Sequence, residues 1–374
     1  MMTGSLRGLK VLDFSTLLPG PMATLFLAEA GAEVIKIERP ETGEDMRYYP
    51  PTWGDSSVNF SLLNRGKKSV TVDLKNQSER EKLIPLIEQA DIFVEQFRPG
   101  VMARLGLDYE SIVKINPKII YCSISGFGQE GPKQHLAGHD INYVGEAGLL
   151  SLGLGSSDNP VVPPALIADI GGGSYPAVIN ILLALRERDL SGKGCYIDVA
   201  MTDGVLPFLW WALGKTSASG ASPENGNDRL TGGSPRYQLY TTRDQRFVAA
   251  GPLEDKFWAA FVEAIGLSEE YRNDSVDPQE TIRQVALIIK NQSATYWEPI
   301  LKEANCCCTI VKNVSEALED QQFRDRGVFD NTVVSGLGDE LPAVPIPIVR
   351  GLKSQDGSQK SAPLLGEHND ELLK

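Results

Sequence analysis

The first third of the chain alternates short apolar segments with longer amphipathic ones, and this alternation restricts the fold more than any other feature. The apolar runs have the length of buried strands, and they occupy residues 11–14, 34–38, 70–74, 91–95 and 119–124. Helical patterns lie between them, at 22–30 and 76–89. Strands that alternate with helices form a parallel sheet with helices on both faces. The sequence therefore predicts an α/β fold.

A glycine run introduces the next long segment. Residues 171–173 are all glycine, and Pro176 precedes an apolar helical pattern that extends to residue 188. An early proline and a largely apolar pattern are typical of a long, mostly buried helix, which we expect to begin at the glycines. Residues 214–235 are rich in Gly, Ser, Asn and Pro, the composition of a linker. Strand and helix patterns then mix over 236–325, so a smaller α+β domain is expected there.

Charge and cysteine content exclude several classes of protein. The 374 residues include 36 Lys and Arg against 49 Asp and Glu, a formal net charge of −13, which makes nucleic acid a poor partner. None of the five cysteines stands in a C-x-x-C pair, so we expect neither a disulfide framework nor a metal site. We interpret the three consecutive cysteines at 306–308 as a buried strand.

No segment has the pattern of a targeting or membrane-spanning sequence. The N-terminal apolar stretch is interrupted by Asp13, Pro19, Pro21 and Glu29, which the core of a signal peptide does not tolerate. No apolar run reaches the length of a bilayer span. Because the cysteines also fit a reducing compartment, we expect a cytoplasmic protein with no membrane partner.

The opening strand–helix–strand pattern raises the question of nucleotide binding. Glu38 ends the second predicted strand, where dinucleotide-binding folds often hold an acid for the ribose. The first turn lacks G-x-G-x-x-G, however, and Pro19 and Pro21 remove backbone donors that would hold a pyrophosphate. A structural unit therefore explains this segment better than NAD binding.

Basic residues concentrate in the first third of this acidic chain. Arg39, Arg98 and Arg104 belong to this group, and several of its members follow predicted strands, where ligands bind in open α/β sheets. Each residue alone fits a solvated surface at least as well. Together they form a local patch suited to a phosphorylated carrier.

Two segments carry candidate catalytic residues. His139 stands in the sequence G-H-D-I-N-Y at 138–143, and Asp169 stands two residues before the glycine run. A helix N-terminus stabilises nearby anions, including a developing enolate oxygen. Glycines such as Gly171 and Gly172 let a ligand approach the backbone closely. For a histidine followed directly by an aspartate, a structural hydrogen bond is the alternative interpretation.

Further motifs extend over almost the whole chain. They are L-K-V-L-D at 9–13, G-A-E-V-I-K-I-E-R-P at 31–40, N-R-G-K-K-S at 64–69, F-R-P-G at 97–100, G-F-G-Q at 126–129, K-G at 193–194 and P-L-L-G-E-H at 363–368. With these motifs the chain resembles the family III CoA-transferases, the CaiB/BaiF type. Within that family it is most similar to the α-methylacyl-CoA racemase branch.

The resemblance implies an architecture and a substrate. A large Rossmann-like α/β domain would comprise residues 1–213 and the returning segment 330–374. A linker at 214–235 would lead to a small α+β domain at 236–329. The family forms interlocked homodimers with the active site near the subunit interface. An acyl-CoA substrate is implied, with no cofactor beyond coenzyme A itself.

The branch decides which reaction the resemblance implies. The racemases use a histidine and an aspartate, which match His139 and Asp169, as the two acid/base groups that invert the carbon α to a thioester. A racemase glutamate matches Glu254, although Pro252 and the two residues after Glu254 depart from the usual pattern. In the transferases, the aspartate matching Asp169 is a nucleophile that forms a covalent aspartyl-CoA. We therefore expect a 2-methylacyl-CoA racemase of lipid metabolism, an isomerase, with CoA transfer as the alternative.

The same resemblance assigns binding roles. The phosphates and adenine of CoA are expected near Arg39, Arg98 and Arg104. The enolate oxygen is expected near Gly171 and Gly172.

Overall fold

The computed structural model describes residues 4–54, 56–354, 357 and 359–373. These residues form two compact units. The first unit comprises Met1–Ala147, Ala165–Pro207 and Gln321–Lys374, and the second comprises Gly148–Pro164 and Phe208–Asp320. The N-terminal and C-terminal segments of the chain therefore belong to the same unit.

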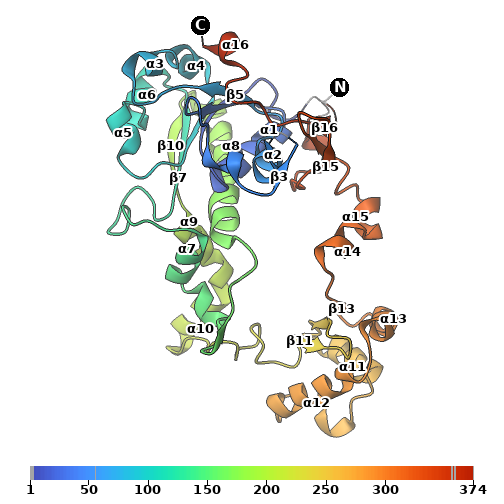
Figure 1. Ribbon diagram of the computed structural model, residues 1–374. Helices are drawn as coiled ribbons and strands as arrows, with labels where there is room; N and C mark the ends of the chain where they lie inside the picture. The colour runs from blue at the N-terminus through green and yellow to red at the C-terminus, as the bar shows by residue number, and fades with distance from the viewer. Residues whose placement is uncertain (1–3, 55, 355–356, 358, 374) are drawn as a thin grey trace. The chain divides into compact units, whose positions relative to one another are not determined.

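A parallel sheet forms the centre of the first unit (Figure 1). Its six described strands, in spatial order, are β10 (Cys195–Ala200), β7 (Ile120–Ser125), β6 (Ile92–Glu95), β1 (Lys10–Phe14), β2 (Glu33–Glu38) and β5 (Lys68–Thr71). Every neighbouring pair is parallel. Their near-continuous apolar sequences follow from burial on both faces. The predicted α/β fold with a parallel sheet is thus confirmed.

Helices pack on both faces of this sheet. The helices described in the first unit are α1 (Pro19–Glu29), α2 (Val58–Asn64), α3 (Gln77–Glu81), α4 (Ile84–Gln89), α5 (Val101–Leu105), α6 (Tyr109–Ile115), α7 (Asp140–Glu146), α8 (Tyr175–Ser191), α9 (Met201–Val205), α15 (Gln321–Asp325) and α16 (Asn369–Leu372). Leu12, Ile35 and Phe93 lie in the buried cluster with residues of α4 and α6. Helix α8 packs against β7 and β10 on the other face, and α1 packs beside it. The alternation of side chains along each strand supplies both faces of the sheet with apolar groups.

Short strands and 3₁₀ turns complete the first unit. They are β3 (Thr52–Trp53), β4 (Ser56–Ser57), β14 (Thr332–Val334), β15 (Glu340–Pro342), β16 (Gln359–Lys360), and the turns Asp45–Tyr48, Leu206–Leu209 and Arg350–Leu352. Strand β14 pairs with both β15 and β16.

The strand order defines where a ligand is expected. From β1 the chain proceeds through β2 to β5 on one side, and then through β6 and β7 to β10 on the other. The order therefore reverses between β1 and β6. In open α/β sheets, ligands bind outside the carboxyl ends of the strands at such a reversal.

Helix α8 corrects the expectation of a mostly buried helix. Ala177, Ile181 and Leu185 are buried, but Ile179 and Leu183 are 56% and 63% exposed. The helix is apolar around much of its circumference, and only one stripe faces the sheet.

The segment that contains α8 also corrects the expectation about bilayer spans. Within the described residues, the continuous helix Ile167–Ser191 has the length and apolar composition of a membrane span. The sequence argument missed it because glycine and serine interrupt the apolar run without adding charge. Helices in protein cores meet the same criterion, and α8 packs on β7 and β10.

The second unit combines a small antiparallel sheet with helices. Its strands are β11 (Gln238–Thr241), β12 (Phe247–Ala250) and β13 (Cys308–Ile310), with the hairpin β8 (Gly155–Ser156) and β9 (Asn159–Pro160). Its helices are α10 (Trp210–Ser219), α11 (Asp255–Ala264), α12 (Pro278–Lys290), α13 (Ala294–Ala304) and α14 (Val314–Leu318), with 3₁₀ turns at Leu149–Leu152 and Glu269–Tyr271. Trp258, Phe261 and Val285 lie in its buried core.

Two local expectations in this unit need correction. Helix α10 extends to Ser219, into the stretch whose composition predicted a linker, because the apolar residues that start the helix precede the Gly- and Ser-rich part. At 306–308, Cys306 and Cys308 are buried but Cys307 is exposed. Cys307 has a left-handed backbone with φ 57°, so the strand begins only at Cys308.

Candidate active site

A cavity of about 520 Å³ opens at the carboxyl ends of β1, β6 and β7, beside the reversal of strand order. Thr16 and Leu17 follow β1, and residues 96–99 follow β6. His139 and Asp169 also line this cavity, and all its lining residues belong to the first unit. The structure thus brings these two predicted residues to one cavity.

Asp169 lies in the first turn of a π-helical segment, Ile167–Ser174, which continues into α8. Burial, and then the charge of Asp140, raise the pKa of the Asp169 carboxyl to about 6, while the positive charge of His139 acts in the opposite direction. The Asp169 N–H donates to Asp140 Oδ1 at 2.9 Å, which brings the two residues together. A carboxyl group with a pKa near neutrality can both donate and accept a proton at physiological pH.

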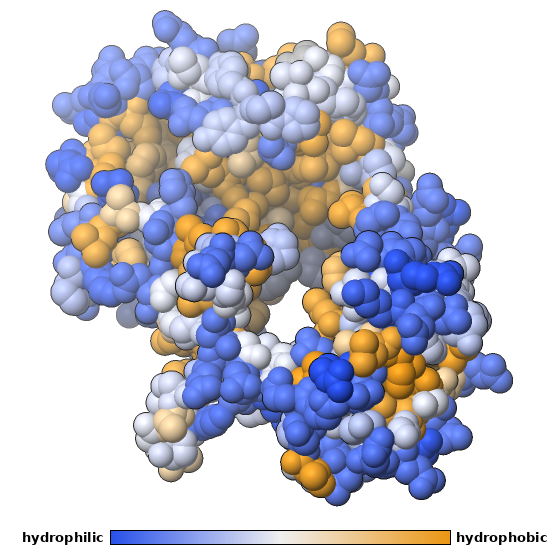
Figure 2. All heavy atoms as spheres, turned by 60° about the horizontal axis from the view of Figure 1, so that its bottom comes forward, coloured by the Kyte–Doolittle hydropathy of each residue, from blue (hydrophilic) through white to orange (hydrophobic). Residues whose placement is uncertain are grey.

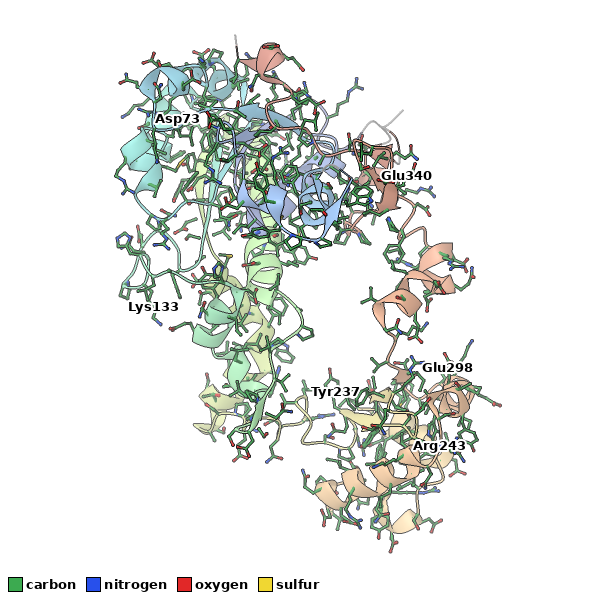
Figure 3. All side chains as sticks on the ribbon, viewed as in Figure 1. Asp73, Lys133, Tyr237, Arg243, Glu298 and Glu340 are labelled. Atoms are coloured by element: carbon green, nitrogen blue, oxygen red, sulfur yellow. The ribbon has the colours of Figure 1, made fainter. Side chains whose placement is uncertain are left out.

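His139 directly precedes α7 and is exposed at the cavity. Its backbone N–H donates to Asn142 Oδ1 at 3.0 Å, so the polar residues of the 138–143 motif shape the helix start. Lys133, labelled in Figure 3, forms an ion pair with Glu146 and connects the loop before His139 to the end of α7. The Asp140 carboxylate accepts the Asp169 backbone N–H, and this bond links the start of α7 to the π-helical segment.

Tyr143 fixes the two glycine-containing loops beside His139. Its hydroxyl donates to the Gly138 carbonyl at 2.5 Å. A Cβ atom at Gly126 would lie 2.4 Å from the Tyr143 ring, and one at Gly138 would lie 2.7 Å from it. Only glycine therefore allows the ring to pack between both loops. This contact explains the first glycine of the G-F-G-Q motif and the glycine of the G-H-D motif.

Gly172 has a packing role that the sequence did not reveal. A Cβ atom there would lie 2.3 Å from the carbonyl oxygen of Met201, at the start of α9. Gly204 in α9 approaches the backbone of Gly172 in the same way. The sequence predicts that the helix begins at Gly171 and Gly172. In the structure it already begins at Ile167, so both glycines lie inside it. Contact of these glycines with a ligand remains a prediction.

A second cavity, of about 810 Å³, lies at the ends of β1, β2 and β5. Arg39 and Arg104 line it together, and it shares Thr16 and Phe97 with the cavity of His139 and Asp169. Arg39 donates to Asp45 Oδ1 at 2.5 Å and stays 62% exposed. Asp73, labelled in Figure 3 after β5, also lines this cavity. The two cavities therefore meet where the strand order reverses.

Arg98 lines the cavity of His139 and Asp169 and not the second one. It also lines a smaller cavity of about 230 Å³ beside Glu95 and Tyr196. Burial and the Asp169 charge raise the pKa of Tyr143, and the Arg98 charge opposes them. The Arg98 guanidinium thus lies close enough to Tyr143 to influence its pKa.

The match to a family model covers residues 6–369 and carries the description CoA-transferase family III. The chain belongs to CoA-transferase family III. Two relatives illustrate its range. The mouse α-methylacyl-CoA racemase is 36% identical over 99% of this chain and 92% of that protein. The acetyl-CoA:oxalate CoA-transferase of Acetobacter aceti is 34% identical over 92% of this chain and 89% of that protein.

A solved structure supports the fold of this family III enzyme. A CaiB/BaiF family protein from Brucella suis superposes with a TM-score of 0.81 at 30% sequence identity. The alignment covers 99% of this chain and 98% of that one. The resemblance inferred from the motifs is therefore confirmed at the level of the family.

Glu254 belongs to the second unit of this family III chain, directly before α11. Its side chain is exposed, and its carbonyl accepts the Trp258 N–H at 2.9 Å. Arg236, from the S-P-R-Y segment, is held by Asp274 and Asp255 at 2.7 Å each. The catalytic role of Glu254 remains a prediction.

The sequence did not reveal the buried charged side chains that lie around Asp13 of β1. Lys67 Nζ donates to Asp13 Oδ2 at 3.1 Å and to Thr24 Oγ1 at 2.8 Å. Burial lowers the pKa of Lys67 to about 8, against the opposing charge of Asp13. Lys36 Nζ donates to the carbonyl of Ser15, the residue that follows β1, at 2.8 Å. The N-R-G-K-K motif was the available signal, but it did not reveal that Lys67 points inward.

Metal binding has no structural support among the described residues, where no group of three or more His, Cys, Asp or Glu side chains is placed to hold an ion.

Proposed function

We propose that this family III enzyme is a 2-methylacyl-CoA racemase that inverts the α-carbon by a two-base proton transfer. The observation that supports it is the pair of acid/base groups, His139 and Asp169, in one cavity. Relatives named α-methylacyl-CoA racemase, from mouse and human, are 36% and 34% identical to the chain. Inversion needs one group to remove a proton from one face of the carbon and another to deliver a proton to the opposite face.

In one direction, neutral His139 removes the α-proton of the thioester and protonated Asp169 delivers a proton to the resulting enolate. In the other direction, ionised Asp169 removes the proton and the imidazolium of His139 delivers one. Each step leaves both groups in the state needed for the reverse reaction. The pKa of Asp169, raised to about 6 by burial and Asp140, suits both roles near neutral pH.

Coenzyme A carries the substrate in this proposal. Its nucleotide end would lie in the cavity of Arg39 and Arg104, with a phosphate near Arg98. The thioester would then extend past Thr16 and Phe97, which line both cavities. Cationic side chains on an acidic protein concentrate a polyanionic ligand at one place.

We also propose that the enzyme is a cytoplasmic homodimer and that Glu254 is a third catalytic residue. The exposed apolar residues of α8, Ile179 and Leu183 among them, support a second copy of the chain as the occupant of that face. Figure 2 shows apolar side chains exposed on the first unit.

CoA transfer is the second candidate, and the carboxylate of Asp169 in the cavity favours it. Asp169 would attack the thioester carbonyl and expel the CoA thiolate, which leaves a mixed anhydride. The thiolate would then attack the aspartyl carbonyl, release the carboxylic acid and leave an aspartyl-CoA thioester. Hydroxylamine added with an acyl-CoA would trap this intermediate as a hydroxamate on Asp169.

His139→Ala separates the two candidates, because only the racemase needs the imidazole as an acid/base group. We expect the variant to lose inversion of 2-methylacyl-CoA by about 10²-fold or more. His135→Ala, an exposed histidine in the same loop, is the matched control and should keep the wild-type rate. An unchanged rate in His139→Ala, or a hydroxamate on Asp169 with CoA transfer to a carboxylate, would contradict the racemase proposal.

A further inference from the structure

Three polar side chains form a row across the sheet next to the catalytic cavity. Glu95 pairs in register with Ser123 on β7, and Ser123 pairs with Asp198 on β10. Residues paired in register on adjacent strands point to the same face. The row therefore lies along the carboxyl edge of β6, β7 and β10, and Glu95 is only 3% exposed.

The row below it is aromatic. Two positions earlier on the same strands, Phe93 and Tyr121 stack with ring centroids 4.7 Å apart, and Tyr196 lies 5.8 Å from Tyr121. These rings form a rigid apolar base for the polar row. The close packing of these rings leaves the Glu95 side chain few other conformations.

The polar row holds two loops. Glu95 Oε2 accepts the Phe97 N–H at 2.7 Å, and the Ser123 hydroxyl donates to Glu95 Oε1. Gln129 Nε2 donates to Ser123 Oγ at 2.8 Å, and the Gln129 N–H donates to Asp198 Oδ2 at 2.9 Å. The segment after β6 and the segment after β7 are thus connected through Glu95 and Ser123.

Both of these loops build the catalytic cavity. Gln96, Phe97 and Arg98 line it from the first loop, and Gly126 lines it from the second. Arg98 follows Phe97 directly, so the hydrogen bond on the Phe97 N–H fixes the backbone from which the guanidinium projects. Arg98 and Glu95 also line the same smaller cavity.

We propose that Glu95 is a positioning residue, which holds the Phe97–Arg98 turn in the conformation that binds the phosphates of coenzyme A. This inference rests on the proposed function, in which Arg98 contacts CoA. Glu95 itself touches no substrate. Its carboxyl acts through the backbone of the loop.

The protonation state of Glu95 suggests a conservative replacement. Burial raises the pKa of Glu95 to about 7, with a smaller contribution from Asp198, against the hydrogen bonds from Ser123 and Phe97. A neutral carboxylic acid offers one donor and one acceptor, and a glutamine amide offers the same pair. Glu95→Gln keeps an oxygen that accepts the Phe97 N–H, and its amide N–H can donate to the Ser123 oxygen once the hydroxyl turns from donor to acceptor, whereas Glu95→Ala can do neither.

The test is CoA titrated into the full-length protein by calorimetry, with acyl-CoA kinetics on the same variants. Glu95→Ala should raise the Kd for CoA and the KM about tenfold, which corresponds to ~1.4 kcal/mol, while kcat stays within about threefold. Glu95→Gln should bind CoA within about twofold of wild type. Glu95→Asp withdraws the carboxylate by one methylene and should weaken binding as well, so the outcome does not depend on alanine alone.

Glu88→Ala is the matched control, because Glu88 is an exposed glutamate at the end of α4. Its Kd should equal that of wild type. Wild-type affinity in both Glu95→Ala and Glu95→Asp would overturn the positioning role, as would a loss in Glu95→Gln equal to that in Glu95→Ala. A wild-type protein that binds no CoA would overturn the proposed function, and this inference with it.

Discussion

Asp140 is buried beside Asp169 and accepts its backbone N–H at 2.9 Å. At the scale of single residues, burial and then the charge of Asp140 raise the pKa of the Asp169 carboxyl. Where Asp169 removes the proton it has to be ionised, so the rate should rise as pH increases through about 6. Where Asp169 donates, the rate should fall through the same range.

Asp140→Asn tests this arrangement. Removal of the neighbouring negative charge lowers the pKa of Asp169, so both pH limbs should move to lower pH. The measurement is the pH dependence of kcat/KM for inversion from each epimer. Asp189→Asn, an exposed position on α8, should leave both limbs in place. Limbs that do not move in Asp140→Asn would show that Asp140 does not act on Asp169.

Lys67 offers a second test at this scale, because its ammonium is the buried partner of Asp13. Lys67→Met removes the salt-bridge partner of the buried Asp13, which keeps its hydrogen bonds from Ser15 and Thr24, and we expect a loss of about 3–5 kcal/mol in the free energy of unfolding. The adjacent Lys68 is partly exposed and pairs with Glu33. Lys68→Met should cost less than about 1 kcal/mol. Urea unfolding of both variants measures the difference, and equal losses would contradict the account.

Sequence and structure agree best on residues that short motifs single out. His139 and Asp169, each in such a motif, line one cavity, while their catalytic roles stay a prediction. The Asp140–Asp169 contact and the Lys67–Asp13 pair were not predictable, because they join segments far apart in the chain. Such contacts depend on the packing of whole elements, which local patterns do not encode.

At the scale of elements, the close approach of the π-helical turn to α9 is the feature most sensitive to change. Gly172→Ala places a methyl group 2.3 Å from the Met201 carbonyl oxygen, and backbone cannot move aside. We expect a loss of about 1–3 kcal/mol or more in the free energy of unfolding. Gly351→Ala, where nothing lies within 4 Å, is the control and should be close to neutral. A stable Gly172→Ala protein would mean that the two segments are not in contact.

The strands of the first unit were predictable because burial on both faces makes their sequences continuously apolar. Helix α8 shows the limit of that reasoning. Its apolar residues predicted burial, but Ile179 and Leu183 are exposed in the chain taken alone. An apolar pattern indicates that a side chain is covered, but it does not indicate which surface covers it.

At the scale of the whole molecule, the proposed homodimer makes a direct prediction. Leu183→Glu places a charge on the exposed apolar face of α8, and we expect it to weaken self-association. Sedimentation velocity over a range of concentrations should show a dimer for wild type and a shift toward monomer for the variant. A wild-type protein that sediments as a monomer at all concentrations would contradict the proposed assembly.

The reaction itself is tested most directly by incubating one epimer of a 2-methylacyl-CoA with the wild-type enzyme in D₂O. The proposal predicts that either starting epimer converges on the same mixture of both, with deuterium at the α-carbon of the inverted product. No inversion and no deuterium incorporation, with CoA instead transferred to an added carboxylate, would contradict it.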